Sequence, residues 1–471
     1  MGTLEVIKKF IESNWIIEKA ARELIERLPL KFRYGISYGP TFRHWLGFLK
    51  ESEKWDRDRL ARYQIEQLRD LLIHAGKNVP YYKTIFEEYG FKPERFQSLD
   101  DIKILPYLDR MTIHEKKEQF IAGNMPGRAF IPTYTSGTSG IPLVIYATKE
   151  TEEKHWATIV DLWGRIGYTP KSKVVFFVAN IRRGNRENLP WNKYSNTLVL
   201  SSNYFVNEWM DRYMEIIDTF KPEYLIGFPH TIAVFCSYMG KSKRKFILDS
   251  LKGVIVYAEN VYEWQMEIIK EVLGVRVFSD YGMVEKVIHG GACEHSTTFH
   301  LYPQYGFTEY LHLHDAMCEL VGTGFINYAM PLIRYKTGDL CAEIRGTCAE
   351  CGRNYDTITR IEGRMGDFLI TSDENIVSVY LDIDFSVFER IKRFQLYQDL
   401  PGKVALRIWP EDSFHIDDTQ RILHEIKRSL GSNASKITFD IVLLDDVDVQ
   451  PAGKFRMVEQ QLNIRSFLKF L

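Results

Sequence analysis

The sequence lacks the long apolar stretches and the excess of one charge that mark several large classes of protein. No apolar run approaches the roughly 20 residues of a membrane-spanning helix, and the densest run, residues 174–179, suits a buried strand. The chain has 61 basic and 62 acidic residues, a formal net charge of -1. Without a basic excess there is no electrostatic footprint for a polyanion. We therefore expect neither a membrane span nor a nucleic-acid partner.

Cysteine and targeting signals are also scarce. Six cysteines in 471 residues are too few for the disulfide framework of a small secreted protein. The start of the chain has no apolar signal-peptide segment, and Val6 stands where a myristoylation motif needs serine or threonine. The G-x-S-x-G elbow of many hydrolases and the G-x-G-x-x-G fingerprint of dinucleotide-binding folds are absent as well. These absences favour a cytoplasmic protein and give no support to a hydrolase or an oxidoreductase.

The length of the chain and its apolar patterns predict an α/β fold with more than one domain. A chain of 471 residues exceeds one ordinary hydrophobic core. Helices are expected over residues 4–29 and 55–75, and the middle of the chain alternates strands with helices, which is typical of a largely parallel sheet. The expected strands are residues 129–134, 144–146, 174–179, 224–226, 254–257 and 275–278, with helices such as 207–220 and 261–273 between them. Ligands of such sheets bind beyond the carboxyl ends of the strands.

The last hundred residues read as a separate, small α+β unit. Strands are expected at residues 404–409 and 437–444, on either side of an amphipathic helix over 417–430. We place the boundary before Asp367. The large domain is then residues 1–366, with an N-terminal helical segment to about residue 75, and the small C-terminal domain is residues 367–471.

One loop that follows an expected strand has the composition of a phosphate-binding site. It packs four hydroxyl residues and two glycines into six positions: Thr135, Ser136, Gly137, Thr138, Ser139 and Gly140. Glycines let the backbone approach a phosphate closely, and successive N–H groups form a nest for an anion. The loop does not end in Gly-Lys-Ser or Gly-Lys-Thr, so it is not a Walker A loop. Taken alone, the same six residues also fit a flexible surface turn.

Four further motifs follow the loop in order along the chain. They read Tyr-Gly-Met-Val-Glu at 281–285, Tyr-Lys-Thr-Gly-Asp-Leu at 335–340, Arg-Ile-Glu-Gly-Arg-Met-Gly-Asp at 360–367 and Pro-Ala-Gly-Lys-Phe-Arg at 451–456. With the loop, this series resembles the adenylate-forming superfamily of acyl-CoA synthetases, luciferases and nonribosomal peptide adenylation domains. The chain looks most like the branch of phenylacetate–CoA ligases and capsule-biosynthesis adenylating proteins, on the detail of residues 201–204 and 220–229. The resemblance covers roughly residues 55–460.

The resemblance implies that ATP and Mg²⁺ convert a carboxylic acid to its acyl-adenylate, with release of pyrophosphate. Catalysis of this reaction is mainly positioning and charge neutralisation. Glu285 matches the family's metal-binding glutamate, and Lys454 matches the lysine that bridges the substrate carboxylate and the phosphate oxygens. Asp367 matches the hinge about which the small domain rotates between half-reactions.

The other matches concern the nucleotide and the acid. Asp339 matches the ribose-binding aspartate, and Arg360 is expected to reach the ribose or the phosphates. The positions expected beside adenine are Ala258, Glu259, Asn260, Tyr281, Gly282 and Met283. The branch builds its acyl pocket near Asn203, Tyr204 and His230, although His230 also fits the purely structural role of a core or rim histidine.

Two departures from the superfamily pattern bear on these matches. Many members carry a lysine shortly after the phosphate loop, whereas Leu143 occupies that region here. The loop is therefore expected to hold phosphates through N–H groups and hydroxyls. Two adjacent acids often mark the hinge, whereas here Gly366 precedes Asp367.

The cysteines suggest a structural zinc site. Cys348 and Cys351 form a C-x2-C knuckle, and Cys293 with His300 supplies a second half-site of the kind that some relatives in this branch carry. His295 is a competing ligand, although its spacing from Cys293 is tight. Four protein ligands leave no open position, so the ion would stabilise the fold. The alternative is a set of reduced, unliganded thiols.

The acceptor of the activated acyl group stays open at this stage. One alternative is coenzyme A, which gives a thioester, and the other is an amine, which gives an amide and would suit surface-polysaccharide synthesis. A non-catalytic binding protein on the same scaffold is a third alternative, against which Glu285, Asp339 and Lys454 argue together. The acid is not identified, and a homodimer is one of the assemblies to be considered.

Overall fold

The structure is a computed structural model of the chain. It describes residues 39–125, 130–135, 143–178, 191–193, 196–205, 207–241, 249–258, 261, 263–314, 317–342, 344, 346–358, 360–362, 368–379, 390–410, 413–444, 458–462 and 467. The helix expected over residues 4–29 lies outside this part of the chain. No helix within it is long and apolar enough to cross a membrane.

The centre of the described structure is a nine-stranded sheet with the order β14-β10-β9-β8-β7-β6-β3-β5-β4. Its strands are β3 (Val174–Val178), β4 (Trp191–Lys193), β5 (Thr197–Ser201), β6 (Tyr224–Gly227), β7 (Gly253–Val256), β8 (Arg276–Gly282), β9 (His289–Ala292), β10 (Phe299–Leu301) and β14 (Thr357–Ile358). The run β5-β3-β6-β7-β8 is parallel throughout, as the alternating sequence pattern predicts. The strands outside this run pair antiparallel.

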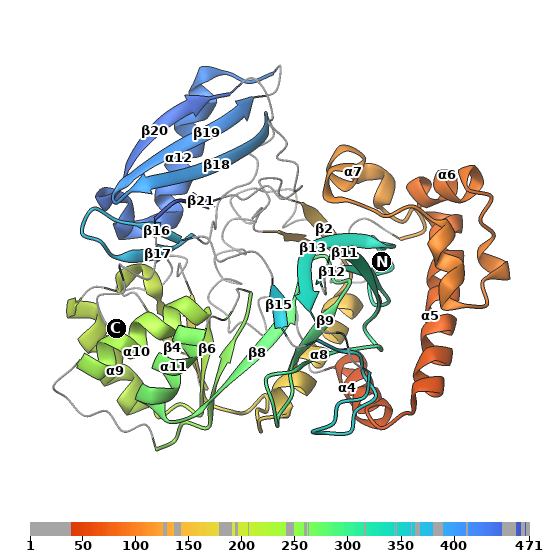
Figure 1. Cartoon of the computed structure of the whole chain (residues 1–471), viewed down its shortest axis with the longest axis horizontal. Coiled ribbons are helices and arrows are strands. Elements are labelled where there is room, and N and C mark those ends of the chain that lie inside the picture. Colours follow the sequence, from red (N-terminus) through yellow and green to blue (C-terminus); the bar gives the residue numbers. More distant parts are fainter. Residues whose placement is uncertain are drawn as a thin grey trace, which may run out of the picture.

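Helices cover both faces of the parallel strands (Figure 1). One face packs against α9 (Asn207–Phe220), α10 (Pro229–Lys241) and α11 (Glu263–Leu273), and the other against α4 (Pro40–Ser52) and α8 (Lys149–Gly164). Successive strand residues alternate between the two layers, since Val175 faces the first core and Val174 the second. Burial on both faces explains why these strands read as unbroken apolar runs in the sequence.

A second, antiparallel sheet lies beside the first and is absent from the sequence-based predictions. It has the order β11-β12-β13-β15, formed by β11 (Gly306–His314), β12 (Met317–Gly324), β13 (Tyr335–Ala342) and β15 (Arg360–Glu362). The expected strands at 129–134 and 144–146 do form, as β1 (Ile131–Tyr134) and β2 (Val144–Ala147). They pair antiparallel with each other as a separate two-stranded sheet, so their inclusion in the parallel pattern was wrong.

The N-terminal helices pack against this second sheet (Figure 1). They are α5 (Arg57–Asn78), which confirms the helix expected over 55–75, α6 (Pro80–Glu88) and α7 (Arg110–Glu115). Short 3-10 turns connect or follow them at η1 (Pro93–Arg95), η2 (Leu99–Ile104) and η3 (Lys117–Phe120), and another, η5 (Ser202–Tyr204), follows β5.

The C-terminal elements form their own lobe, drawn in blue in Figure 1. Their sheet has the order β20-β19-β18-β21, from β18 (Ile391–Leu400), β19 (Lys403–Pro410), β20 (Thr438–Leu443) and β21 (Val458–Gln460). The lobe also holds α12 (Ile416–Leu430), η7 (Gly431–Lys436) and the hairpin of β16 (Phe368–Ile370) and β17 (Ile376–Ser378). Ile422 and Ile426 of α12 pack on Leu396 and Leu406 in a core of their own. The three elements expected in this region are confirmed, whereas the boundary at Asp367 stays a prediction because residues 363–367 lie outside the described structure.

Candidate functional site

The order of the parallel strands indicates where a ligand would bind. Within the parallel run, β3 is the first strand along the chain. Strand β5 lies on one side of β3, and β6, β7 and β8 follow in order on its other side. Ligands of such sheets bind beyond the carboxyl ends of the strands, where the order reverses. Tyr204 follows β5, His230 follows β6, Ala258 follows β7 and Tyr281 lies near the end of β8. The candidate acyl and nucleotide residues therefore gather along one edge of the sheet.

The residues at the base of the candidate phosphate loop are hydrogen-bonded to each other. Thr135 is buried, and its backbone N–H donates to the carbonyl oxygen of Leu143 at 3.0 Å. The N–H of Leu143 donates in return to Thr135 Oγ1 at 2.8 Å. These two bonds fix the ends of the loop, while the predicted ligands Ser136, Gly137, Thr138, Ser139 and Gly140 lie outside the described residues.

Glu285 lies in the turn after β8 and is tied to the base of this loop through one arginine. The Nη2 atom of Arg110 donates to Glu285 Oε1 at 3.2 Å and to Thr135 Oγ1 at 2.9 Å. The hydroxyl of Tyr335 on β13 donates to the same Glu285 Oε1 at 3.1 Å. Glu285 Oε2 has no hydrogen-bond partner within the described residues, which leaves one carboxylate oxygen for a cation.

Sequence reasoning missed Arg110, and the structure explains how it reaches the site. Leu108 forms a parallel bridge to Tyr335, with its N–H donating to the Arg334 carbonyl and its own carbonyl accepting from the Lys336 N–H. Asp109 then caps α7 by accepting from the Thr112 N–H at 2.7 Å. Arg110 is the first residue of that helix. No local pattern in the sequence indicates that residue 108 pairs with residue 335.

Asp339 projects from an irregular part of β13. The register shows Thr337, Gly338 and Asp339 facing the single residue Leu320 of β12. Gly338 adopts a φ of 74°, a left-handed conformation that glycine tolerates best, and its N–H donates to Glu319 Oε1. Asp339 Oδ2 then accepts a 2.9 Å hydrogen bond from the Tyr281 hydroxyl.

The backbone on either side of Glu285 is constrained. Gly282 faces His289 across the β8–β9 pair, and a Cβ at this position would come within 2.7 Å of His289 Nδ1. Lys286 has a φ of 56°, and its ammonium is buried against Glu152 of α8 at 3.2 Å. Ala258, one of the expected adenine contacts, has a φ of 66°. Non-glycine residues in this region are uncommon and carry a conformational cost.

A buried carboxyl group lies directly before Tyr281. Asp280 accepts a 2.8 Å hydrogen bond from Trp163 Nε1 and lies 3.7 Å from His289 Nε2. Burial raises the pKa of Asp280 to about 7 and lowers the pKa of His289 to about 3. The imidazole of His289 is therefore neutral near neutral pH, and the Asp280 carboxyl is held in the layer between the sheet and α8.

This burial predicts a pH dependence of stability. Folded Asp280 keeps its proton up to about pH 7, whereas the unfolded group has a pKa of 3.8, so the folded chain binds more protons between these values. The contribution of this group to stability falls as the pH rises through that window, by at most about 4 kcal/mol. Asp280→Asn should remove this fall. In thermal melts from about pH 5 to 7.5, the melting temperature of the wild type should decline relative to the variant.

The control for this prediction is Asp218→Asn, at a half-exposed ion pair with Lys221. Parallel curves for wild type and Asp280→Asn would show that Asp280 does not take up a proton on folding.

Several other predicted residues cannot be assigned contacts. Glu259, Asn260, Asp367 and Lys454 lie outside the described residues, as do the side chains of Asn203 and Arg360. Met283 is partly buried and packs against the core beneath the second sheet. Tyr204 is 39% exposed, and His230 is buried at the start of α10. The roles expected for all of these residues stay predictions.

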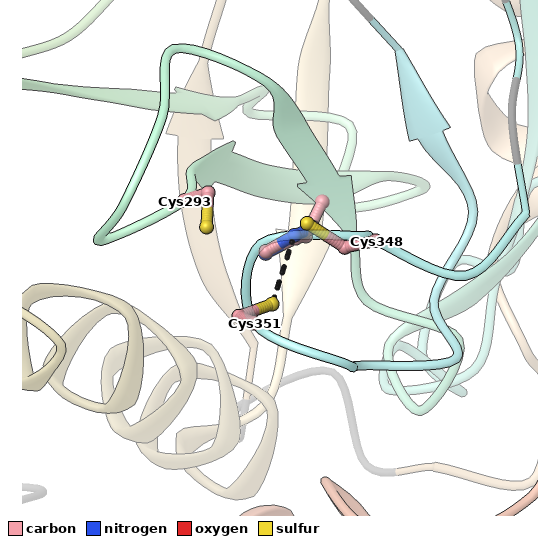
Figure 2. A group of neighbouring side chains, drawn as sticks. Cys293, Cys348 and Cys351 are labelled. Carbon is pink, nitrogen blue, oxygen red and sulfur yellow. Dashed lines mark hydrogen bonds between the residues drawn. The ribbon is translucent and has the colours of Figure 1, made fainter.

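The two cysteine half-sites come together at the end of the sheet formed by β9, β10 and β14. Cys293 follows β9, His300 lies in β10, and Cys348 and Cys351 belong to the loop before β14. The four ligand atoms lie within 4.8 Å of one another, and Figure 2 shows the three cysteines surrounding one point. In a tetrahedral zinc site, bonds of about 2.3 Å place ligand atoms about 3.8 Å apart, so the arrangement fits the ion with little movement. His295 is exposed and is not part of this group.

The surroundings of the cluster hold its two halves together. The guanidinium of Arg353 binds Glu53 and, at 2.7 Å, Glu294, and thereby joins the knuckle to the residue beside Cys293. Burial, with the nearby cations Arg165 and Arg353, lowers the pKa of His300 to about 3, so its imidazole is neutral. His300 Nδ1 accepts from Arg165 Nη1 at 3.0 Å, while Nε2 is 3.5 Å from Cys351 Sγ. Binding of a metal through Nε2 would move the ring proton to Nδ1 and displace Arg165.

Comparisons with known proteins agree with the fold and with the motif series. A family model described as the CapK C-terminal domain matches residues 369–461. The phenylacetate-coenzyme A ligase of Escherichia coli (strain K12) is 24% identical over 417 residues, which are 82% of this chain and 91% of that enzyme. Protein CapK of Staphylococcus aureus is 21% identical over 418 residues, 84% of this chain and 88% of that protein.

A solved structure of similar fold is that of 2-hydroxyisobutyryl-CoA ligase in complex with 2-HIB-AMP and CoA. It has a TM-score of 0.60 at 17% sequence identity and covers 88% of this chain and 92% of that one. This likeness concerns the fold alone. Together the comparisons confirm the resemblance found in the sequence: the chain is a homologue of phenylacetate–coenzyme A ligases and of CapK, with the fold of the adenylate-forming CoA ligases.

Proposed function

We propose that the protein uses ATP and Mg²⁺ to activate a carboxylic acid as its acyl-adenylate and then transfers the acyl group to coenzyme A. The observation that carries this proposal is the hydrogen-bonded network across three separated parts of the chain. Arg110 joins the base of the phosphate loop at Thr135 to Glu285, and Tyr335 joins Glu285 to β13. Asp339, the candidate ribose ligand, lies on the same strand and accepts from Tyr281.

Glu285 is the candidate magnesium ligand. Mg²⁺ is commonly held by one or two carboxylates together with substrate phosphates. Glu285 is buried beside the loop base, and its Oε2 atom accepts no hydrogen bond within the described residues. A metal there would neutralise charge on the phosphates, while Lys454 is expected to contact the reacting carboxylate in the first half-reaction.

The four-residue Cys/His group is the candidate structural zinc site. Three thiols and one neutral imidazole form a donor set that zinc favours over magnesium or calcium. The group lies on β10, just after β9 and in the loop before β14, and its four ligands leave no position for a substrate. Its proposed role is to join residues 293–300 to residues 348–351.

An amine acceptor is the second candidate for the second half-reaction. The specific observation in its favour is the match of residues 369–461 to the CapK C-terminal domain. The small domain is expected to rotate between half-reactions and so to face the acceptor. The amide would suit surface-polysaccharide synthesis, as expected from the capsule-related branch.

One experiment separates the two acceptors. Purified protein would be incubated with ATP, Mg²⁺ and a panel of aromatic and aliphatic carboxylic acids, with coenzyme A, with an amino sugar, or with neither. We expect one or a few acids to give AMP release that coenzyme A stimulates strongly, with a thioester detected by mass spectrometry. AMP release that ignores coenzyme A but yields an amide with the amino sugar would favour the second candidate.

A further inference from the structure

Arg110 is buried but uses only part of its hydrogen-bonding capacity. Its side chain is 12% exposed, and Nη2 donates to Thr135 and Glu285. The Nε and Nη1 atoms are buried without a hydrogen-bond partner in the described part of the chain. A guanidinium carries five N–H donors, so three remain unsatisfied. Leaving donors of a buried cation unpaired is costly, and the cost is removed if a ligand supplies the acceptors.

Arg334 shows how a structural arginine is accommodated in the same region. Its Nε and Nη2 atoms form a bidentate pair with Glu309, at 2.8–3.2 Å. Its Nη1 atom donates to the carbonyl oxygens of Lys103 and Leu105. All three nitrogens of Arg334 thus have acceptors within the protein, whereas two of the three nitrogens of Arg110 have none among the residues that the structure describes. If Arg110 served only to pair with Glu285, the burial of its Nε and Nη1 atoms without acceptors in the described part of the chain would have no purpose.

The position of Arg110 identifies the kind of ligand. It contacts the first residue of the phosphate loop and the candidate magnesium ligand. Planar guanidinium groups bind phosphate oxygens with two parallel hydrogen bonds. A Mg²⁺ ion held by Glu285 would also bind substrate phosphates, so a cation beside Glu285 would lie near the same phosphates. Leu143 occupies the region where many members of the superfamily carry a lysine, and a positive charge from another segment would replace it.

We propose that Arg110 is a catalytic residue that binds the β- and γ-phosphate oxygens of ATP through Nε and Nη1 and stabilises the departing pyrophosphate. This rests on the proposed adenylation of a carboxylic acid. In that step the acid's oxygen attacks the α-phosphorus, the bond between the α-phosphorus and the bridging oxygen breaks, and pyrophosphate leaves with the electron pair. A fixed cation next to the leaving group stabilises the charge that develops there.

The test is to compare ligands that contain or lack the terminal phosphates. Dissociation constants of ATP, pyrophosphate and AMP would be measured by calorimetry, with Mg²⁺ present, for wild type, Arg110→Met and Arg110→Lys. Loss of a charge-assisted pair should weaken ATP and pyrophosphate binding about 10- to 100-fold in Arg110→Met, with AMP changed less than about 2-fold. Arg110→Lys keeps the charge without the planar guanidinium, so its affinities for ATP and pyrophosphate should lie between those of wild type and Arg110→Met. Arg57→Met, at a half-exposed ion pair with Asp356, is the matched control and should bind all three ligands like wild type.

The possible outcomes distinguish a failure of the role inferred for Arg110 from a failure of the proposed function. Equal weakening of ATP and AMP in Arg110→Met, or unchanged ATP binding, would overturn the role of Arg110 while leaving adenylation intact. A wild type that binds no ATP would instead refute the proposed function. If thermal melting shows that Arg110→Met does not fold, Arg110→Lys decides, because it retains a partner for Glu285: a selective loss of ATP and pyrophosphate affinity supports the inference, and wild-type affinity contradicts it.

Discussion

Glu285→Gln is expected to reduce ATP–pyrophosphate exchange by about 10²- to 10³-fold, the effect of removing one preorganised electrostatic group from such a site. The glutamine Oε1 atom can still accept from Arg110 and Tyr335. The amide nitrogen in place of Oε2, however, is a donor without charge and cannot coordinate Mg²⁺. The rate would be measured at saturating ATP over a wide range of Mg²⁺ concentrations.

The same substitution should also lower stability, because it leaves the buried Arg110 without its counter-charge. Breaking a buried pair from one side costs about 3–5 kcal/mol, and removing both charges costs much less. Arg110→Met/Glu285→Gln should therefore melt closer to wild type than Glu285→Gln does, while remaining inactive. An exchange rate within about 3-fold of wild type in Glu285→Gln would exclude a metal-binding role for this residue.

Cys351→Ser is expected to remove zinc from the protein and to lower its stability by about 4 kcal/mol or more, since loss of a structural metal is among the few large single-site effects. Serine is a much weaker zinc ligand than a thiolate, and three remaining ligands hold the ion poorly. Metal content would be measured by mass spectrometry after gel filtration, and thermal melting followed with and without a chelator. We expect about one zinc per chain in wild type.

Cys236→Ala provides the matched control for this prediction. Cys236 is buried among apolar residues that pack on the parallel sheet and is not one of the four clustered ligands. Its replacement should leave the zinc content unchanged and should lower the stability much less than Cys351→Ser does. A wild-type protein that is folded, contains no zinc and melts at the same temperature with and without a chelator would contradict the proposal. The cluster would then be a group of reduced thiols.

The parallel sheet could be predicted because its signal is local. Strands such as β3 and β6 are buried on both faces, so their sequences are unbroken apolar runs. The sheet β11-β12-β13-β15 could not be recognised in the same way. Its strands carry charged residues that are paired across the sheet or with loops, such as Glu309 with Arg334 and Glu319 with Lys336. Those partners are apparent only after folding.

The residues of the candidate site differ in the same way: some are marked by a local sequence pattern, and others come to the site only through tertiary contacts. Motifs of five and six residues mark Tyr281, Glu285 and Asp339, and each motif contains a glycine, Gly282 or Gly338, in close contact with a neighbour or at a positive φ. Arg110 carries no such mark, since it reaches Glu285 only through the bridge from Leu108 to Tyr335. The cytoplasmic location, the oligomeric state and the roles of Lys454 and Asp367 stay predictions. The knuckle at Cys348 and Cys351 is readable from spacing alone, whereas its meeting with His300 depends on the pairing of β10 with β14.

The most direct test of the account is carboxylate-dependent exchange of labelled pyrophosphate into ATP, measured without any acyl acceptor. Reversible adenylation predicts exchange that requires Mg²⁺ and one class of carboxylic acid and is largely lost in Lys454→Ala. No exchange from folded protein with any acid across a broad aromatic, aliphatic and hydroxy-acid panel would contradict the proposed adenylation. Exchange that persists unchanged in both Lys454→Ala and Glu285→Gln would contradict the assigned site.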